Sequence, residues 1–258
     1  MPGTTRTALV GGASAGIGLA TARALAAAGR NVMLMGRTDE TLAKTAASLD
    51  TQHGVDTVVA DLADPAAPQV AVDAVERRFG ALDVLVLNAG GPPPGRILDP
   101  SDDQWRAATE LLLLGPLRFA RLVLPAMAGR GFGRVVVVTS TAVRQPQPVL
   151  ALSVVLRAAV TNAVKLLSRE YADRGVTVNC VAPGATATGR REQILRARAA
   201  EQGVGLDDMD RADTADVPAG RAGDADEVAA AIAFLCSDAA SYVNGTVLTV
   251  DGGRTESI

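Results

Sequence analysis

The chain has few of the residues on which many protein chemistries depend. Its 258 residues include one histidine, two cysteines and two tyrosines, and aromatic residues make up only 3% of the total. A cysteine- and histidine-based metal site needs more ligands than this, so we expect no metal. Cys180 and Cys236 lie in apolar runs and are interpreted as small buried side chains rather than a disulfide pair. His53 lies in a polar stretch and is interpreted as a surface loop residue.

Two further absences limit where the protein can be located and which partners it can bind. The formal net charge of −3 gives no basic surface of the kind that binds nucleic acid. The first residues lead within a few positions into a short apolar strand and glycines, without an apolar stretch long enough for a signal peptide or a membrane span. We therefore expect a cytoplasmic protein that binds a small-molecule substrate, and neither nucleic acid nor membrane.

The chain is instead rich in regularly alternating apolar segments. Short runs of valine, isoleucine and leucine alternate with longer segments of helical periodicity, and hydrophobic residues make up 48% of the chain. This alternation predicts βαβ units and a parallel sheet buried on both faces. We expect one α/β domain over residues 1–258, a Rossmann-type doubly wound fold of about seven parallel strands with helices on both faces. The predicted strands are Thr7–Val10, Asn31–Met35, Asp56–Ala60, Val84–Leu87, Arg134–Thr139, Thr177–Ala182 and Val247–Val250.

A glycine-rich turn follows the first predicted strand. It reads Gly11-Gly12-Ala13-Ser14-Ala15-Gly16-Ile17-Gly18 and leads into the helix-forming segment Leu19–Ala28. Glycines here allow a tight turn, close approach of the backbone to a pyrophosphate, and close packing of helix on strand, with the phosphate facing the helix N-terminus. The turn indicates dinucleotide binding, although such a turn alone is also compatible with a purely structural role.

Further motifs follow in a fixed order. Asp61-Leu62 follows the third strand, Asn88-Ala89-Gly90 the fourth, Ser140 the fifth and Pro183-Gly184 the sixth, and Asp251-Gly252-Gly253 ends the series. With the Gly-x-x-x-Gly-x-Gly spacing of the turn, this order resembles the short-chain dehydrogenase/reductase family over essentially the whole chain. The Gly-Pro-rich segment Gly90–Gly95 and the altered catalytic positions described next resemble a divergent subgroup, the 3-oxoacyl-carrier-protein reductase-like proteins.

The resemblance implies a dinucleotide cofactor held by several loops. Asp61 and Leu62 would hold the adenine, Asn88-Ala89-Gly90 would line the ribose, and Pro183, Gly184 and Thr188 would hold the nicotinamide carboxamide. The implied cofactor-binding residues are Gly12, Ser14, Gly16, Ile17, Gly18, Arg37, Asp61, Leu62, Asn88, Ala89, Gly90, Arg157, Pro183, Gly184 and Thr188.

The end of the second strand bears on the choice between NAD(H) and NADP(H). A carboxylate there would bind the 2′-hydroxyl of NAD and repel a 2′-phosphate. This chain has Gly36-Arg37, which offers room and a planar cation that can bind phosphate. We expect NADP(H), with NAD(H) not excluded; the alternative is that Arg37 is a solvated loop residue stacking on adenine.

The catalytic positions depart from the family pattern of Asn, Ser, Tyr and Lys. Ser140 stands at the serine position, whereas Leu112 stands at the Asn, Ser153 at the Tyr and Arg157 at the Lys. Neither Tyr171 nor Tyr242 falls where it could replace the missing acid. Serine is a much weaker acid than tyrosine, and arginine stays protonated and cannot act as a base. The catalytic candidates Ser140, Ser153 and Arg157 can therefore polarise a carbonyl, but no obvious proton donor is present.

Two more segments shape the predicted site. Three prolines between Gly91 and Gly95 predict a stiff rim, and residues 189–220 correspond to the substrate lid of the family. Arginines at the start of the lid are either solvated or meet an acidic substrate. The resemblance also implies a homodimer or homotetramer formed through helices at Asp103–Met127 and Ser153–Ala172.

Three functional hypotheses follow. The first is an NADP(H)-dependent oxidoreductase that acts on a carbonyl or alcohol by a non-standard proton-transfer route. The second is a non-catalytic NADP(H)-binding protein, either a sensor or the partner of an active relative. The third is a lyase or dehalogenase-like activity, which ranks last because the halohydrin dehalogenases of this fold keep the Tyr and lose the glycine-rich turn, the opposite pattern.

Overall fold

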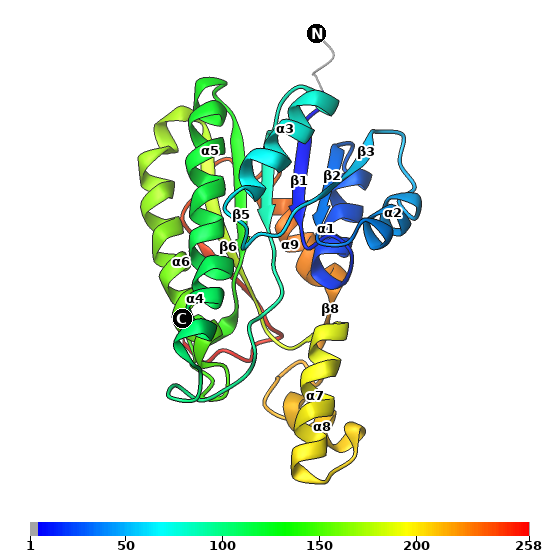
Figure 1. The fold of residues 1–258 in the computed structure, drawn as a ribbon, viewed down its shortest axis with the longest axis vertical. Helices are drawn as coiled ribbons and strands as arrows, with labels where there is room; N and C mark the ends of the chain where they lie inside the picture. Colours follow the sequence, from blue (N-terminus) through cyan, green and yellow to red (C-terminus); the bar gives the residue numbers. More distant parts are fainter. Residues whose placement is uncertain (1–4, 258) are drawn as a thin grey trace.

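The core of the molecule is one parallel sheet. The computed structural model describes residues 5–257, in which seven strands form the sheet shown in Figure 1. The strands are β1 (Thr7–Gly11), β2 (Asn31–Gly36), β3 (Val55–Val59), β4 (Val84–Leu87), β5 (Gly133–Val138), β6 (Val176–Pro183) and β9 (Val247–Val250). All seven predicted strands are confirmed, and no boundary differs by more than one residue.

The strand order predicts a ligand-binding crevice at the carboxyl ends of the strands. The order is β3-β2-β1-β4-β5-β6-β9, and every pairing is parallel. From β1 the chain first winds towards β3 and then returns to β4 on the other side, so β1 and β4 flank the switch point. In such sheets, ligands bind outside the carboxyl ends of the strands at this point. The predicted motifs all follow strand carboxyl ends.

Helices cover both faces, as the doubly wound fold requires. On one face a buried cluster joins the sheet to α1 (Gly16–Ala27), α2 (Asp39–Ala47) and α9 (Ala225–Leu235). On the other, a second cluster joins it to α3 (Ala67–Phe79), α5 (Gly115–Gly129) and α6 (Ala151–Glu170), with α4 (Asp102–Thr109) packed on α6. The fold prediction is confirmed.

A π-helical segment interrupts the long helix after β4. Glu110–Leu114 forms the π-helix η1 between α4 and α5. A Cβ on Gly115 would lie 2.2 Å from the Leu62 carbonyl oxygen, so this helix approaches the loop after β3 as closely as the backbone allows. Single π-turns inside α-helices are frequent at functional sites. Here the turn carries Leu112, the residue predicted to occupy the Asn position of the resembled family.

Two helical stretches in this layer are long and apolar enough to cross a membrane by length and composition alone, Asp102–Gly129 and Ala151–Glu170. Both lie beside the sheet (Figure 1), and α5 and α6 contact β5 and β6. Helices in the core of an α/β protein commonly pass the same test.

The segment predicted as a lid extends from the body as a helix pair. Figure 1 shows α7 (Gly189–Gln202) and α8 (Leu206–Thr214) projecting beyond the sheet. A two-stranded ribbon of β7 (Thr186–Ala187) and β8 (Gly223–Asp224) connects the pair to the body. Leu195, Ala199 and Met209 form a small buried cluster of their own inside it. The short helices η2 (Thr141–Val143) and η3 (Ala172–Arg174) complete the described elements.

Candidate functional site

The glycine-rich turn has the geometry that dinucleotide binding requires. Gly12 has φ +59° and Gly16 has φ +52°, both in the left-handed region that favours glycine. A Cβ on Gly18 would lie 2.0 Å from the Gly12 carbonyl oxygen, so helix α1 leaves the turn with no room for a side chain there. The half-buried Ser14 and Ile17 lie within the same turn.

The turn is tied to β4 across the switch point. Asn88 donates a hydrogen bond from Nδ2 to the Gly11 carbonyl at 3.3 Å. A Cβ on Gly12 would lie 2.8 Å from the same Nδ2 atom. Asn88 therefore supports the turn directly, and Ala89 and Gly90 continue from it along the crevice. The start of α1 carries no side-chain cap, which leaves its first N–H groups available to an anion.

Arg37 and Asp61 lie after neighbouring strands at the same sheet edge. Gly36 pairs in register with Val59, so the loops that carry Arg37 and Asp61 leave the sheet side by side. Among residues 5–257 the exposed Arg37 side chain has no hydrogen bond or ion pair. Asp61 Oδ1 accepts a hydrogen bond from the Ala63 N–H at 3.0 Å, which fixes the carboxylate in the loop.

The opposite side of the crevice is formed after β6. A Cβ on Gly184 would lie 2.6 Å from the Asp251 Cβ, so glycine is required where the two strand ends meet. Thr188 caps α7 by accepting a hydrogen bond from Arg191 N at 3.3 Å. A Cβ on Gly16 would lie 3.1 Å from Thr188 Cγ2, so Thr188 lies directly against the glycine-rich turn. Pro183, Gly184 and Thr188 thus border the predicted cofactor crevice.

Arg157 and Ser153 form a contact on α6. Arg157 donates from Nε to Ser153 Oγ at 3.1 Å and from Nη1 to the Val138 carbonyl at 2.6 Å. Val138 ends β5, so the guanidinium lies at the strand end that leads to Ser140. The Arg157 residue is only 8% exposed. Burial lowers its pKa to about 10, and within residues 5–257 it forms no ion pair with a carboxylate.

The two serine hydroxyls each retain a free donor. Ser140 Oγ accepts from the Ala142 N–H at 3.1 Å, and Ser153 Oγ accepts from Arg157 Nε. In the described part of the chain neither hydroxyl donates a hydrogen bond. Each hydroxyl can therefore donate a hydrogen bond to a substrate oxygen.

Leu112 and Arg157 line the same small cavity, in which Leu112 places an apolar side chain. The cavity leaves about 10 Å³ for the centre of a water molecule, roughly the space for one water. It is lined by Leu62, Leu87, Ala89, Leu111, Leu112, Pro116, Val137, Val138, Arg157 and Val160. Arg157 carries the only polar side chain among these ten. A buried water needs two to four polar partners, so this cavity offers a poor path for proton transfer.

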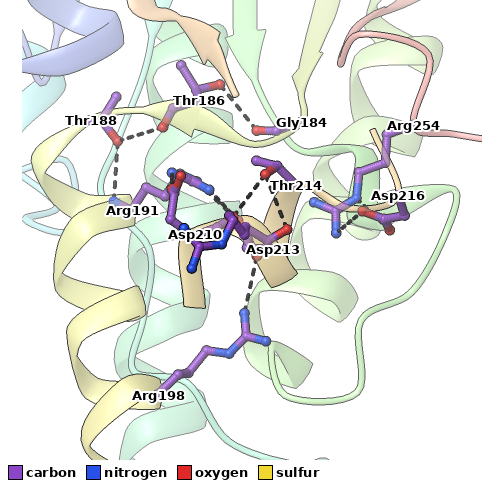
Figure 2. A network of polar contacts seen from close by, with 11 residues as sticks. Gly184, Thr186, Thr188, Arg191, Arg198, Asp210, Asp213, Thr214, Asp216 and Arg254 are labelled. Atoms are coloured by element: carbon purple, nitrogen blue, oxygen red, sulfur yellow. Dashed lines mark hydrogen bonds and ion pairs between the residues drawn. The ribbon is translucent and has the colours of Figure 1, made fainter. Parts of the chain in front are cut away.

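Ion pairs between α7 and α8 hold the predicted lid together. Figure 2 shows Arg191 between Asp210 and Asp213, with Arg198 reaching Asp213 from the next turns of α7. The Arg191–Asp213 pair is 2.8 Å long, and the two side chains are 15% and 16% exposed. Because Arg191 and Arg198 pair with aspartates of α8, an acidic substrate would have to bind other residues of this segment.

One contact of the lid was not predicted from the sequence. Arg190 Nη2 donates to the Pro92 carbonyl at 2.9 Å and so joins α7 to the proline-rich rim. The rim also pairs with the start of α6, where the Gly95 N–H donates to the Val149 carbonyl at 2.9 Å. Because proline has no N–H to donate, a proline-rich segment leaves its carbonyls to donors from other segments, which is a weak signal for this contact in the sequence.

Other candidate groups lie away from the site. Lys165 Nζ donates to the Gly245 carbonyl at 3.1 Å and cannot replace the family lysine. Tyr171 ends α6 and packs on the core, while Tyr242 is fully exposed. Cys180 and Cys236 are buried and unpaired, as predicted, and burial raises the pKa of each thiol to about 12. His53 is exposed as predicted, and residues 5–257 hold no cluster of metal-ligating side chains.

Known proteins identify the family. Residues 12–255 match a family model described as "Enoyl-(Acyl carrier protein) reductase". The 3-oxoacyl-[acyl-carrier-protein] reductase FabG of Salmonella typhimurium is 36% identical over 246 residues, which cover 95% of this chain and 96% of that protein. This chain belongs to the short-chain dehydrogenase/reductase family. Within this family of oxidoreductases it is similar to the FabG-like group.

Solved structures of short-chain reductases match the whole fold. An L-sorbose reductase from Gluconobacter frateurii, complexed with NADPH and L-sorbose, has a TM-score of 0.93 at 30% identity and covers 99% of this chain and 98% of its own. A variant of actinorhodin polyketide ketoreductase with NADPH also has a TM-score of 0.93, at 33% identity and 98% coverage of both chains. The Rossmann-type architecture is therefore shared from end to end.

Proposed function

We propose that this short-chain family member is an NADP(H)-dependent oxidoreductase that acts on a carbonyl or alcohol without the family's tyrosine acid. The observation that carries the proposal is the pair of Ser153 and Arg157 beside the end of β5, across the crevice from an intact glycine-rich turn. The turn supports cofactor binding, and the pair supports a site for a substrate oxygen.

The residues of the crevice fit a dinucleotide with a 2′-phosphate. The positive φ angles of Gly12 and Gly16, the absence of space for a Cβ at Gly18 and the uncapped start of α1 form a cradle for a pyrophosphate. The free guanidinium of Arg37 would hold the 2′-phosphate by a charge-assisted, bidentate contact. NADPH in both matching reductase structures supports the same choice.

When bound, NADPH supplies a hydride; the protein must orient the substrate and stabilise the charge that develops on its oxygen. Ser140 and Ser153 can each donate a hydroxyl hydrogen to that oxygen. Arg157 adds a positive charge in a buried place, where it interacts more strongly than in water. Arg157 also lies where the family lysine binds the nicotinamide ribose, and its fork can do the same.

No side chain of this site is a general acid of the kind that donates a proton efficiently near neutral pH. Losing such an acid commonly lowers the rate by about 10² to 10⁴. The apolar cavity beside Leu112 offers Arg157 as its sole polar side chain, which argues against a buried relay. We propose that the proton comes from solvent at the open side of the crevice, near the free hydroxyl of Ser153.

The test is NADPH oxidation with a panel of ketones, β-ketothioesters and quinones, against a heat-inactivated control. We expect oxidation of NADPH with at least one class of carbonyl and a preference for NADPH over NADH. Absence of oxidation with every class would remove the oxidoreductase proposal.

A second candidate function is a non-catalytic NADP(H)-binding protein, favoured by the absence of a tyrosine at position 153. It predicts tight NADPH binding without turnover by the natural chain. The triple variant Ser153→Tyr, Arg157→Lys, Leu112→Asn would then gain turnover that the natural chain lacks. A protein that binds no NADPH would contradict both candidates.

We also propose a homodimer or homotetramer formed through α4–α5 and α6. The exposed apolar side chains Val155 and Leu166 on α6 support this contact. The leucines of η1 give this contact little support, because Leu112 is buried and Leu111 and Leu113 pack partly on the core of the subunit. Light scattering at several protein concentrations measures the state directly.

A further inference from the structure

We infer that the amino-terminal end of the sheet carries an anion site, in which Arg6, Arg30 and Arg134 bind the phosphate group of inorganic phosphate or of a small phosphomonoester. The inference goes beyond the proposed function, because this site lies away from the cofactor crevice. The crevice follows the carboxyl ends of the strands, whereas the three arginines lie at or next to the first residues of β1, β2 and β5. In Figure 1 this end of the sheet is at the top, and the predicted lid projects from the bottom.

The three arginines form one connected cluster around the end of α9. Arg30 Nη2 and Arg134 Nε donate to the consecutive backbone carbonyls of residues 236 and 237, at 2.7 and 3.1 Å. Arg6 Nη1 donates to Oδ1 of the next residue, Asp238, at 2.6 Å. All three guanidinium groups therefore reach the same short stretch of chain.

An aromatic ring holds two of these guanidinium groups close together. The guanidinium carbon of Arg6 lies 3.5 Å from the centre of the Phe132 ring, and that of Arg134 lies 4.4 Å from it. Contacts of this kind attract a cation to the ring and keep it in place. Because like charges repel, two cations kept on one ring favour an anion beside them.

The cluster carries more positive than negative charge. Within residues 5–257, Asp238 is the one carboxylate that pairs with any of the three arginines, and its side chain is 73% exposed. Asp83 lies within electrostatic range of Arg30, but it pairs with Arg130 at 3.8 Å and accepts from the Thr7 N–H. The end of α9 adds roughly half a negative charge. More than one positive charge is left over, which matches the charge of about −1.5 to −2 on a phosphate group at neutral pH.

Burial makes this excess of positive charge costly. Arg30 and Arg134 are buried, and burial lowers the pKa of both guanidinium groups. Both donate to neutral carbonyls, which compensate a cation less than an anion does. The Arg30 Nε is enclosed and has no acceptor in the described part of the chain. Arg6, whose side chain is 34% exposed, leaves the cluster open to an anion from solvent.

Arg78 provides a balanced counterpart elsewhere on the surface. Its guanidinium carbon lies 5.1 Å from the centre of the Phe79 ring, and its Nε pairs with Asp56 at 3.2 Å. One cation meets one anion here, and both side chains are about half exposed. Arg78 thus has the ring and the carboxylate that Arg6 has, without sharing the ring with a second arginine, and it serves as the matched control.

Isothermal titration of the full chain with sodium phosphate tests the site. The titration is run at constant ionic strength and about pH 7.5, where the phosphate group is mostly a dianion, with NADPH present to occupy the cofactor crevice. We expect Arg6→Gln to weaken phosphate binding by about tenfold, because a contact with a charged group is lost. Asp238→Asn should strengthen phosphate binding by about two- to fivefold, the size of one exposed charge interaction. Arg78→Gln should leave it unchanged.

The opposite signs of the two substitutions distinguish an anion site from a simple cap of α9. If the arginines only cap the helix, Arg6→Gln and Asp238→Asn will not change the affinity for phosphate, and that result would overturn the inference. A natural chain that binds no phosphate would overturn it as well.

A second titration, with glycerol 3-phosphate, distinguishes the two sources of the phosphate group. Binding as tight as that of inorganic phosphate, and equally sensitive to Arg6→Gln, would support a phosphomonoester as the ligand. Binding of inorganic phosphate alone would support the free ion. Neither titration measures turnover, so a protein that oxidises no NADPH would remove the proposed function and leave this inference standing.

Discussion

The two sides of the crevice differ in what holds them in place. On the cofactor side the main chain defines the site, because Gly12 and Gly16 have positive φ angles and Gly18 has no room for a Cβ. On the proposed substrate side the defining residues, Ser153 and Arg157, occupy ordinary helical positions. A site made by the backbone cannot change without loss of the turn, whereas the side chains of a helix can be exchanged while the fold stays.

The largest effect should come from adding a side chain to the glycine-rich turn, where the main chain defines the site. Gly18→Ala places a Cβ 2.0 Å from the Gly12 carbonyl, so the turn must shift. We expect a loss of about 3 kcal/mol in the free energy of unfolding, near the upper end for overpacking, and loss of NADPH binding. Urea denaturation and NADPH titration measure both.

The control for this substitution is Gly129→Ala. Gly129 ends α5, and a Cβ added there would have no heavy atom within 4 Å. Alanine at this position should be neutral or stabilising by up to about 1 kcal/mol. If Gly18→Ala behaves like Gly129→Ala, the cofactor side is less rigid than its geometry indicates.

The next effect should come from the lid, which contacts both sides through Thr188 and Arg190. Asp213→Asn removes a charge shared by Arg191 and Arg198 and leaves the well-buried Arg191 guanidinium undercompensated. We expect local unfolding of α7 and α8 to become about tenfold more frequent, which corresponds to the roughly 1.4 kcal/mol typical of such a contact. Hydrogen exchange of the two helices measures it.

A matched variant, Glu192→Gln, removes the exposed ion pair with Arg196 on the same helix. Exposed pairs contribute little, so hydrogen exchange should change by less than about twofold. Equal effects of the two variants would show that the shared carboxylate of Asp213 does not hold the lid.

An effect of similar size, but selective for one cofactor, should follow from Arg37→Ala. Removal of the guanidinium should lower the affinity for NADPH by about tenfold, the usual range for a charge-assisted contact, and leave the affinity for NADH unchanged. Isothermal titration with both cofactors gives the ratio. Arg23→Ala, an exposed arginine on α1, is the control. An equal loss for NADPH and NADH would instead fit stacking of Arg37 on adenine.

The smallest effect should be the dependence on pH of the two quantities that involve Arg157, namely its contribution to stability and the turnover of NADPH. Burial lowers the pKa of Arg157 from its usual value to about 10, so the folded state releases this proton before the unfolded state as pH rises. Its contribution to stability is therefore constant below about pH 9 and increases with pH above about 10. Turnover of NADPH should be flat from about pH 6 to about pH 9. A break near neutrality would reveal a titrating acid in the site.

Some features of this comparison could be predicted from residue order. The seven strands were predicted to within one residue, because parallel strands buried on both faces leave continuous apolar runs. The contact of Ser153 with Arg157 follows from a spacing of four residues on one helix. The geometry at Gly12, Gly16 and Gly18 follows from the absence of a Cβ at each position.

Other features depend on residues that are distant in the sequence. The π-turn at Leu112 accompanies the close approach of Gly115 to Leu62, more than fifty positions earlier. Arg191 and Arg198 were open to either solvent or an acidic substrate, and pairing with Asp213 follows from how α7 packs on α8. Local periodicity carries no information on which of several charges will meet.

The sequence by itself determined the fold and the cofactor turn and predicted that the family's acid is missing, because apolar period, glycine spacing and residue identity are local properties. Only the tertiary structure decided the surroundings of the altered residues. It buried Arg157 without a carboxylate, closed the space beside it with Leu112, and left the Ser153 hydrogen free. Burial and pairing depend on which segments meet in space, and those meetings define the chemistry that the crevice can perform.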